Sequence, residues 1–278
     1  MSRKAAVAVI SVSVLIIALL TGALIYVIVT QRPQPEDNKT VETVETVEAV
    51  ETVEEDAVDL IEELDNKTSK RPEKWYGTFE SSGSVEDPKD LAKYRTKCPD
   101  VYAYIEIPGT DIGYPIAYCE DAVDPFWFTH DIDGNESDSG MIITDAVNSG
   151  DLSDTMTLIY GRSPADGTMF SQLERFRDSQ FFDSHEYVNI YTDDAELVYR
   201  IYACYIDSSD HILANYDFND PKGFEAYFDH AANVRDLGIN IREEVRPSVG
   251  DHVIGLITHC DDESKRLFVL AVLDDVRY

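Results

Sequence analysis

The sequence predicts a mainly β domain over residues 87–278, folded as a barrel or a sandwich. Short runs of aliphatic and aromatic residues alternate in this segment, as in Val101 to Ile107. Turn residues such as Pro108 and Gly109 separate these runs. About eight short strands within one segment are typical of a barrel or a sandwich. The N-terminal third of the chain has a different character.

Residues 5–29 carry no charged side chain and consist mostly of Ala, Val, Ile and Leu. Such a run is long enough to cross a bilayer as a helix. Basic residues at positions 3 and 4 precede it, and they favour a cytoplasmic N-terminus with the rest of the chain outside the cell. We therefore expect a cytoplasmic tail at 1–4 and a transmembrane signal anchor at 5–29. A cleaved signal peptide is the alternative, but the run is longer than a usual signal core and no clear Ala-x-Ala site follows.

Residues 30–86 are predicted to form an acidic spacer. Residues 40–54 repeat a Thr-Val-Glu triplet, with Ala49 replacing one threonine. A period of three fits neither a strand nor a heptad, and its like charges repel one another. An extended, solvated chain is the main interpretation, and a partly helical stalk through residues 55–64 is the alternative.

The formal net charge is −31, with 54 acidic and 23 basic residues. A nucleic-acid partner held through its phosphates needs a basic face, so this charge excludes that class of function.

The elements of the domain follow from local patterns. A short helix over residues 87–94 is predicted, with Asp87 as its cap and Pro88 in its first turn. Another short helix is expected at 168–173, and apolar residues at helical spacing predict a third at 221–234. Strands are expected at 101–107, 112–116, 140–144, 156–160, 187–191, 196–206, 252–257 and 267–273.

The four cysteines are Cys98, Cys119, Cys204 and Cys260. Their even number in an extracellular protein allows two disulfides. Cys204 and Cys260 lie in or at the end of predicted strands, whereas Cys98 and Cys119 flank one hairpin and are a possible pair. No spacing of Cys or His indicates zinc, and the acidic loop at 131–138 lacks the ligand order of an EF-hand. We therefore predict no metal and no cofactor.

The last two strands are predicted to form a hairpin with Cys260 and Arg266 facing each other at its mouth. Opposite residues on paired strands have Cβ atoms roughly 5 Å apart, so the thiol and the guanidinium would touch. A neighbouring cation lowers the pKa of a thiol and favours the nucleophilic thiolate. A buried core cysteine followed by a surface arginine is the alternative.

Four segments together resemble the sortases, and more closely their class B. They are the hairpin at 104–116, Tyr160-Gly161 followed by the segment 166–170, the helix at 221–234, and the hairpin with Cys260 and Arg266. They occur in the family's order and follow an N-terminal signal anchor. The resemblance covers roughly residues 90–278.

The resemblance implies a closed sortase-type β-barrel with short helical insertions. It also implies a cysteine transpeptidase that cleaves a C-terminal sorting signal of secreted proteins through a Cys260 thioacyl intermediate. Arg266 would bind the oxyanion or position the substrate carbonyl. A cell-wall precursor or peptidoglycan amine would be the acceptor, and the enzyme would act outside the membrane of a Gram-positive bacterium.

Arg162 stands where the family has its catalytic histidine. Arginine stays protonated and cannot pass a proton to a leaving amine, but its charge can stabilise a thiolate. His211, after a long predicted strand, is the better substitute as acid. His259 should point away from the thiol, because successive strand side chains face opposite ways.

Three functions therefore remain open from the sequence. The first is a working class B-like sortase with an altered acid. The second is a sortase-fold pseudoenzyme that binds sorting-signal peptides without turnover. The third is a cysteine peptidase that hydrolyses its thioacyl intermediate.

Overall fold

The computed structural model describes residues 74–85, 88–120 and 125–278, which belong to a unit spanning residues 71–278. The predicted tail, the anchor at 5–29 and the spacer up to residue 73 lie outside the described residues. Among the residues that are described, no helix combines the length and the apolar character needed to cross a membrane.

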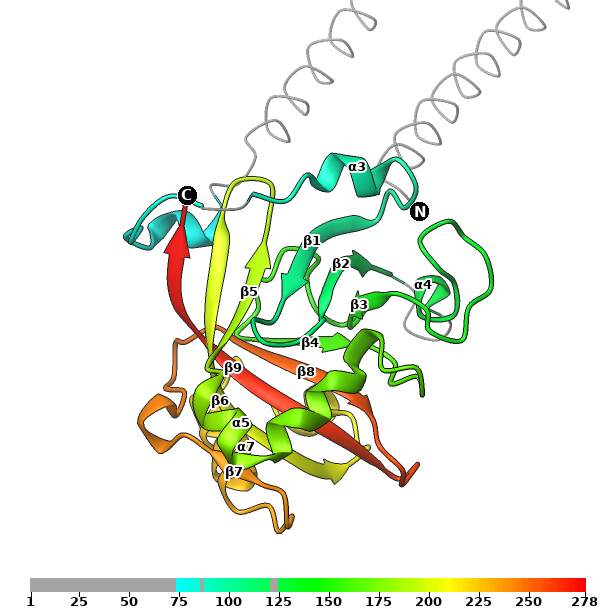
Figure 1. Ribbon diagram of the computed structural model, residues 1–278. Helices are drawn as coiled ribbons and strands as arrows, with labels where there is room; N and C mark the ends of the chain where they lie inside the picture. The colour runs from blue at the N-terminus through cyan, green and yellow to red at the C-terminus, as the bar shows by residue number, and fades with distance from the viewer. Residues whose placement is uncertain (1–73, 86–87, 121–124) are drawn as a thin grey trace, which may run out of the picture. The chain divides into compact units, whose positions relative to one another are not determined.

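Eight of the described strands close into a barrel (Figure 1), which confirms the predicted fold class. Their order is β5-β1-β2-β3-β4-β8-β9-β6, and the barrel closes because β6 also pairs with β5. The short strand β7 adds to the outer edge of β6. The bounds are β1 Val101–Glu106, β2 Gly113–Tyr118, β3 Ile142–Thr144, β4 Met156–Tyr160, β5 Tyr187–Tyr191, β6 Glu196–Ser208, β7 Asn240–Ile241, β8 Val253–His259 and β9 Lys265–Arg277.

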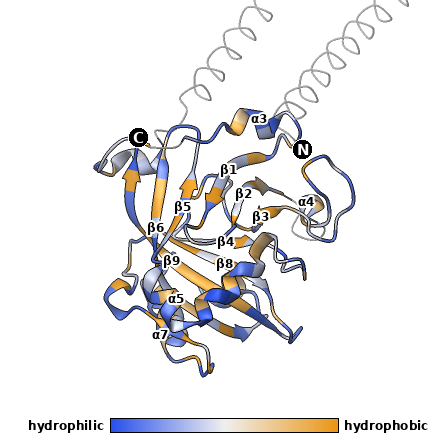
Figure 2. Cartoon of the chain, viewed as in Figure 1, coloured by the Kyte–Doolittle hydropathy of each residue, from blue (hydrophilic) through white to orange (hydrophobic). Residues whose placement is uncertain are grey.

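Alternation along the strands divides the buried side chains between two apolar clusters. Along β8, Ile254 and Leu256 belong to the cluster inside the barrel, whereas Val253 and Ile257 belong to a second cluster on the other face of the sheet. Figure 2 shows the apolar residues concentrated along the barrel strands. The second cluster is completed by helix α7, Pro221–Ala232, and its predicted apolar stripe is buried as expected.

The remaining helices differ from the predictions in position. Asp90, rather than Asp87, caps the first predicted helix, which is α3, Leu91–Arg95; Asp87 lies outside the described residues. The helix expected at 168–173 is a longer 3-10 helix, η2, Met169–Arg177. Sequence patterns missed η1 Trp75–Thr78, α4 Phe126–Thr129, α5 Ser179–Ser184, α6 Ile212–Asn215 and η3 Glu243–Val245. These elements are too short for a helical period to show.

The folded unit also begins before residue 87. Tyr76 in η1 is only 4 % exposed and packs in the barrel cluster. The Trp75 indole donates a hydrogen bond to the Asp151 carbonyl at 2.9 Å. The end of the predicted spacer is therefore part of the domain.

Strands β4 and β8 run parallel, so their ends carry Gly161 and Thr258 to the same place. The Thr258 hydroxyl donates to the Gly161 carbonyl at 2.7 Å, and the Gly161 amide donates to the Ile257 carbonyl at 3.1 Å. A Cβ on Gly161 would lie 2.5 Å from Ile142 Cδ1 and 2.6 Å from the Phe170 ring. A larger residue here would force the buried side chains of Ile142 and Phe170 to shift. Arg162 follows Gly161 directly and therefore lies close to the end of β8.

We expect Thr258→Val to destabilise the domain by about 1–2 kcal/mol, because the buried Gly161 carbonyl loses its donor while volume is conserved. Urea unfolding of the full chain measures the free energy of unfolding. Thr258→Ser keeps the hydroxyl and is the matched control. Equal losses for the two variants would contradict the assigned role of the hydrogen bond.

Candidate active site

The β8–β9 hairpin has a register that differs from the predicted one. Arg266 lies opposite His259, and Thr258 lies opposite Leu267. The predicted facing pair of Cys260 and Arg266 is therefore wrong by one residue. Along β9, Leu267 and Val269 belong to the barrel cluster, so Arg266 alternates onto the face of α7 together with His259.

Cys260 is the first residue beyond β8 and is partly exposed. Its thiol contacts the Asp262 carbonyl oxygen at 3.5 Å. Together with His259 it lines a cavity of about 450 Å³, which also includes Ser163 and Arg177. The thiol is therefore accessible at the rim of the barrel. Because Cys260 lies beyond the last paired residue of β8, strand pairing does not determine where its side chain points.

The other cysteines are buried. No disulfide joins any of the four, all of which lie in the described part of the chain. Cys98 and Cys119 belong to one apolar cluster, and burial raises the pKa of the Cys98 thiol to about 11. Cys260 is thus the most accessible thiol of the domain.

Arg266 is held by the hairpin turn. Its Nη1 atom donates to the carbonyl oxygens of Glu263 at 2.9 Å and Lys265 at 2.6 Å. These contacts keep the guanidinium close to the turn that carries Cys260. A guanidinium there adds positive charge beside the turn that follows Cys260.

Arg162 follows Gly161 at the end of β4 and is held against Phe128. Its Nε donates to the Phe128 carbonyl oxygen at 2.9 Å, and its guanidinium carbon lies 4.7 Å from the centre of the Phe128 ring. This second arginine is therefore fixed in position rather than extended into solvent.

His259 lies within electrostatic range of both arginines. The sequence pattern did not predict this grouping. The His259 ring stacks on Phe128 with the ring centres 6.5 Å apart. Burial, followed by the charges of Arg266 and Arg162, lowers the pKa of the imidazole. We call Arg162, His259, Arg266 and Phe128 the arginine cluster. The one sign of this cluster in the sequence was a histidine, His259, directly before Cys260.

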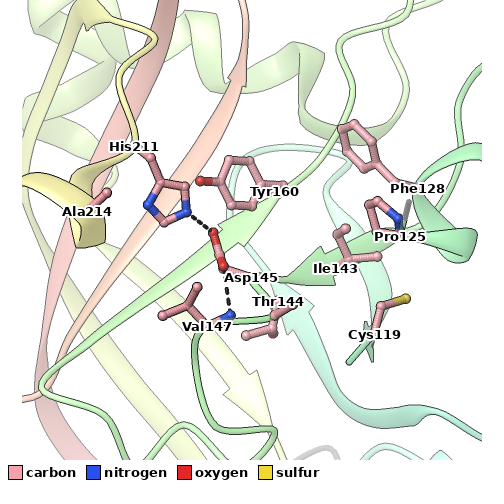
Figure 3. A pocket seen from close by; sticks show the side chains of 11 residues that line it. Cys119, Pro125, Phe128, Ile143, Thr144, Asp145, Val147, Tyr160, His211 and Ala214 are labelled. Atoms are coloured by element: carbon pink, nitrogen blue, oxygen red, sulfur yellow. Dashed lines mark hydrogen bonds and ion pairs between the residues drawn. The ribbon is translucent and has the colours of Figure 1, made fainter. Parts of the chain in front are cut away.

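A second cavity, of about 510 Å³, borders the arginine cluster (Figure 3). Phe128 and Tyr160 line it, and Tyr160 is within electrostatic range of Arg266. At its mouth His211 Nε2 lies 2.7 Å from Asp145 Oδ2. The other lining residues are mostly apolar, namely Cys119, Pro125, Ile143, Thr144, Ala146, Val147 and Ala214.

The structure places the predicted alternative acid, His211, in this cavity and not beside Cys260. The other histidines are engaged elsewhere. His130 stacks on Phe126 and His185 on Phe181. His252 packs against Trp75 with tilted rings, and His230 pairs with Asp207 at 2.5 Å. Within the described ranges, no group of three or more His, Cys, Asp or Glu side chains is arranged to hold a metal ion.

We expect Arg162→Gln to raise the pKa of His259, because the neutral amide removes one of the charges that disfavour imidazolium. Arg162→Lys keeps the charge and serves as the control. Titration of the His259 ring by NMR measures the value. Because the folded pKa lies below the ordinary one, protonating His259 opposes folding as the pH falls below about 6.5. An unchanged pKa in Arg162→Gln would contradict the cluster.

Comparison with known proteins relates the whole domain to one enzyme group. The chain is 27 % identical to sortase B of Listeria monocytogenes over 187 residues, which cover 67 % of this chain and 72 % of that protein. It is 23 % identical to sortase B of Staphylococcus aureus over 176 residues, or 62 % and 69 % of the two chains. No family model matches the sequence.

Solved structures give the same relationship for the fold. Sortase B of Clostridium perfringens aligns with a TM-score of 0.59 at 24 % identity, over 66 % of this chain and all of that chain. Sortase B of B. anthracis in complex with AAEK1 aligns with a TM-score of 0.59 at 21 % identity, over 72 % and 91 % of the two chains. By sequence the chain is similar to sortase B, and its barrel has the fold of the solved sortase B structures.

Proposed function

We propose that the chain is a class B-like sortase, a cysteine transpeptidase that uses Cys260 as its nucleophile. The observation that carries this proposal is an accessible thiol directly after His259, whose imidazole is within electrostatic range of Arg162 and Arg266, in a barrel similar to sortase B. Its substrates would be secreted proteins with a C-terminal sorting signal. The acceptor would be an amine of the cell-wall precursor or peptidoglycan.

The proposed reaction has two halves. The Cys260 thiolate attacks a peptide carbonyl, and the C–N bond breaks to give a thioacyl enzyme and a released amine. An acceptor amine then attacks the thioester, forming a new amide and returning the thiol. Arg266 and Arg162 supply positive charge for the thiolate and for the oxyanion of each step.

Complexes of related proteins support both substrates. S. aureus sortase B has been solved as a substrate complex, which aligns with a TM-score of 0.55. A sortase B complexed with triglycine aligns with a TM-score of 0.58. The anchor proposed at residues 5–29 would hold the domain on the outer side of the cell membrane, where such substrates occur. The spacer would extend it toward the cell wall.

A second candidate is a pseudoenzyme that binds sorting-signal peptides without turnover. Two observations favour it. The register places His259, rather than Cys260, opposite Arg266. Phe128 holds the side chain of Arg162, which by the sequence resemblance stands in place of the family's histidine. A binding protein needs the cavity and the cluster, but it does not need the thiol.

Acyl transfer to Cys260 separates these functions. We expect the full chain, incubated with a library of sorting-signal peptides and quenched in acid, to carry a peptide adduct on Cys260 by mass spectrometry. Cys260→Ala should abolish the adduct, and Cys98→Ala, which alters a buried thiol, should retain it. Release as an amide with added triglycine indicates a transpeptidase, and release only as an acid indicates a peptidase. Peptide binding without an adduct would establish the pseudoenzyme.

We expect Arg162→His to raise the rate of adduct formation at least tenfold, because general acid catalysis typically contributes a factor of ~10² to 10⁴. The imidazole can protonate the leaving amine, which a guanidinium cannot do. Arg162→Gln, which removes the charge and supplies no proton, is the control and should be slower than the unmodified chain. A rate for Arg162→His as low as that of Arg162→Gln would show that this position does not face the reacting bond.

A further inference from the structure

The arginine cluster concentrates positive charge in a chain whose formal net charge is −31. Neither Arg162 nor Arg266 forms an ion pair with a carboxylate of the described residues. Most of the other described arginines do form one, as Arg95 does with Asp193 at 2.8 Å. The positive charge of the cluster is therefore available to an anion from outside the domain.

Several hydrogen-bond donors of the cluster have no partner within the ranges that the structure describes. Arg162 uses its Nε–H on the Phe128 carbonyl oxygen, which leaves both of its Nη groups. Arg266 uses Nη1 on two carbonyl oxygens of the turn, which leaves Nε and Nη2. The exposed His259 side chain makes no hydrogen bond with any described residue. Because paired guanidinium N–H groups match the two oxygens of a carboxylate, these donors favour that anion.

Phe128 holds these groups together and connects them to a cavity. The Arg162 guanidinium carbon lies 4.7 Å from the centre of the Phe128 ring, and the His259 ring stacks on the same ring. Arg266 lies opposite His259 in the pairing of β8 with β9. Phe128 also lines the cavity of Figure 3, which has a volume of about 510 Å³ and mostly apolar walls. A ligand held by the cluster can therefore place an uncharged part in this cavity.

The charge of the cavity decides which end of such a ligand enters it. Asp145 lines the cavity, and its side chain is only 9 % exposed. A ligand carboxylate among the apolar walls would lose hydration and would be repelled by Asp145. At the cluster, the same carboxylate would be attracted by Arg162 and Arg266. We therefore expect the anionic end of the ligand at the cluster and the uncharged end in the cavity.

We propose that the arginine cluster binds the carboxylate at the C-terminal end of a short peptide, with the preceding residues in the adjoining cavity. The inference goes beyond the proposed transpeptidase function, because it requires neither the Cys260 thiol nor acyl transfer. No covalent bond forms or breaks. A free carboxylate of this kind is left wherever a peptide bond has been hydrolysed, so the ligand class is the product of a hydrolytic reaction.

Protonation of His259 should be coupled to this binding. Burial, followed by the charges of Arg266 and Arg162, lowers the pKa of the imidazole, and Glu263 opposes them. Phe128, which packs on the ring, carries no charge. A bound carboxylate would offset the two arginine charges and raise the pKa of His259. By linkage, the carboxylate should bind more tightly as the pH falls through that pKa, since it stays ionised itself above about pH 4.

The test uses the full chain and N-acetyl-triglycine, which has a carboxylate but no amine. The C-terminal amide of the same peptide is the matched probe without the charge. We expect the acid to bind and to raise the pKa of His259, measured by NMR titration of the ring, whereas the amide should leave that pKa unchanged. The affinity for the acid, measured by calorimetry, should increase from about pH 8 to about pH 5.5. His259→Gln should abolish this increase and retain binding.

Two arginine variants locate the site. Arg162→Gln removes one guanidinium and should bind the acid about tenfold more weakly, as expected for a lost charge-assisted hydrogen bond. Arg175→Gln is the matched control. Arg175 also lies over a phenylalanine ring, 4.0 Å from the centre of Phe181, and donates to the Gly109 carbonyl oxygen at 2.8 Å. It is not part of the cluster, so this variant should bind the acid as the unmodified chain does.

Each part of the proposal can be overturned. Equal affinities for the acid and its amide would exclude a carboxylate site. An unchanged affinity in Arg162→Gln, or an equal loss in Arg175→Gln, would show that the cluster is not the site. Acetate that binds as tightly as the peptide would exclude the role of the cavity. Failure of the proposed transpeptidase function has a different sign, the absence of a peptide adduct on Cys260, and it leaves these affinities unaffected.

Discussion

The antiparallel pairing of β8 with β9 is the constraint on which the site depends. Its register decides which side chains of the terminal hairpin face the arginines, because a shift of one residue moves every side chain to the other face. Arg266 opposite His259 creates the arginine cluster and leaves Cys260 just beyond the last paired residue. The parallel pairing of β4 with β8 then carries Arg162 to the same place.

The charges of the domain are separated over a short distance. The chain is strongly acidic, yet Arg162 and Arg266 gather around His259, where burial together with their charges disfavours imidazolium. The adjoining cavity carries the carboxylate of Asp145. Phe128 belongs to the arginine cluster and also lines this cavity, so the two regions are adjacent.

Much of the fold was predictable from sequence because strand alternation and the stripe of α7 are strong periodic signals. The limits of β4 and β5 match the predicted ranges, and β9 extends beyond its predicted end to Arg277. The helices α4 and α6 are too short to show a helical period in the sequence. Helix α4 nevertheless carries Phe128, and His211 is the N-cap residue of α6. The two-residue strand β7 is likewise too short to show a pattern.

The site was predicted less completely than the fold, for a physical reason. Motifs identified Cys260, Arg266 and Arg162 as residues of one region, but the hairpin turn sets the register, and the sequence of a turn seldom fixes its length. The prediction therefore paired Arg266 with Cys260 instead of His259. The contact between His211 and Asp145 joins residues 66 positions apart, and no local pattern could reveal it.

The register of the terminal hairpin can be measured in solution by cross-strand nuclear Overhauser effects between backbone protons. We predict such effects between His259 and Arg266 in the folded chain, together with those between Thr258 and Leu267. Effects that instead join Cys260 to Arg266 would refute this register and would restore the facing thiol and guanidinium.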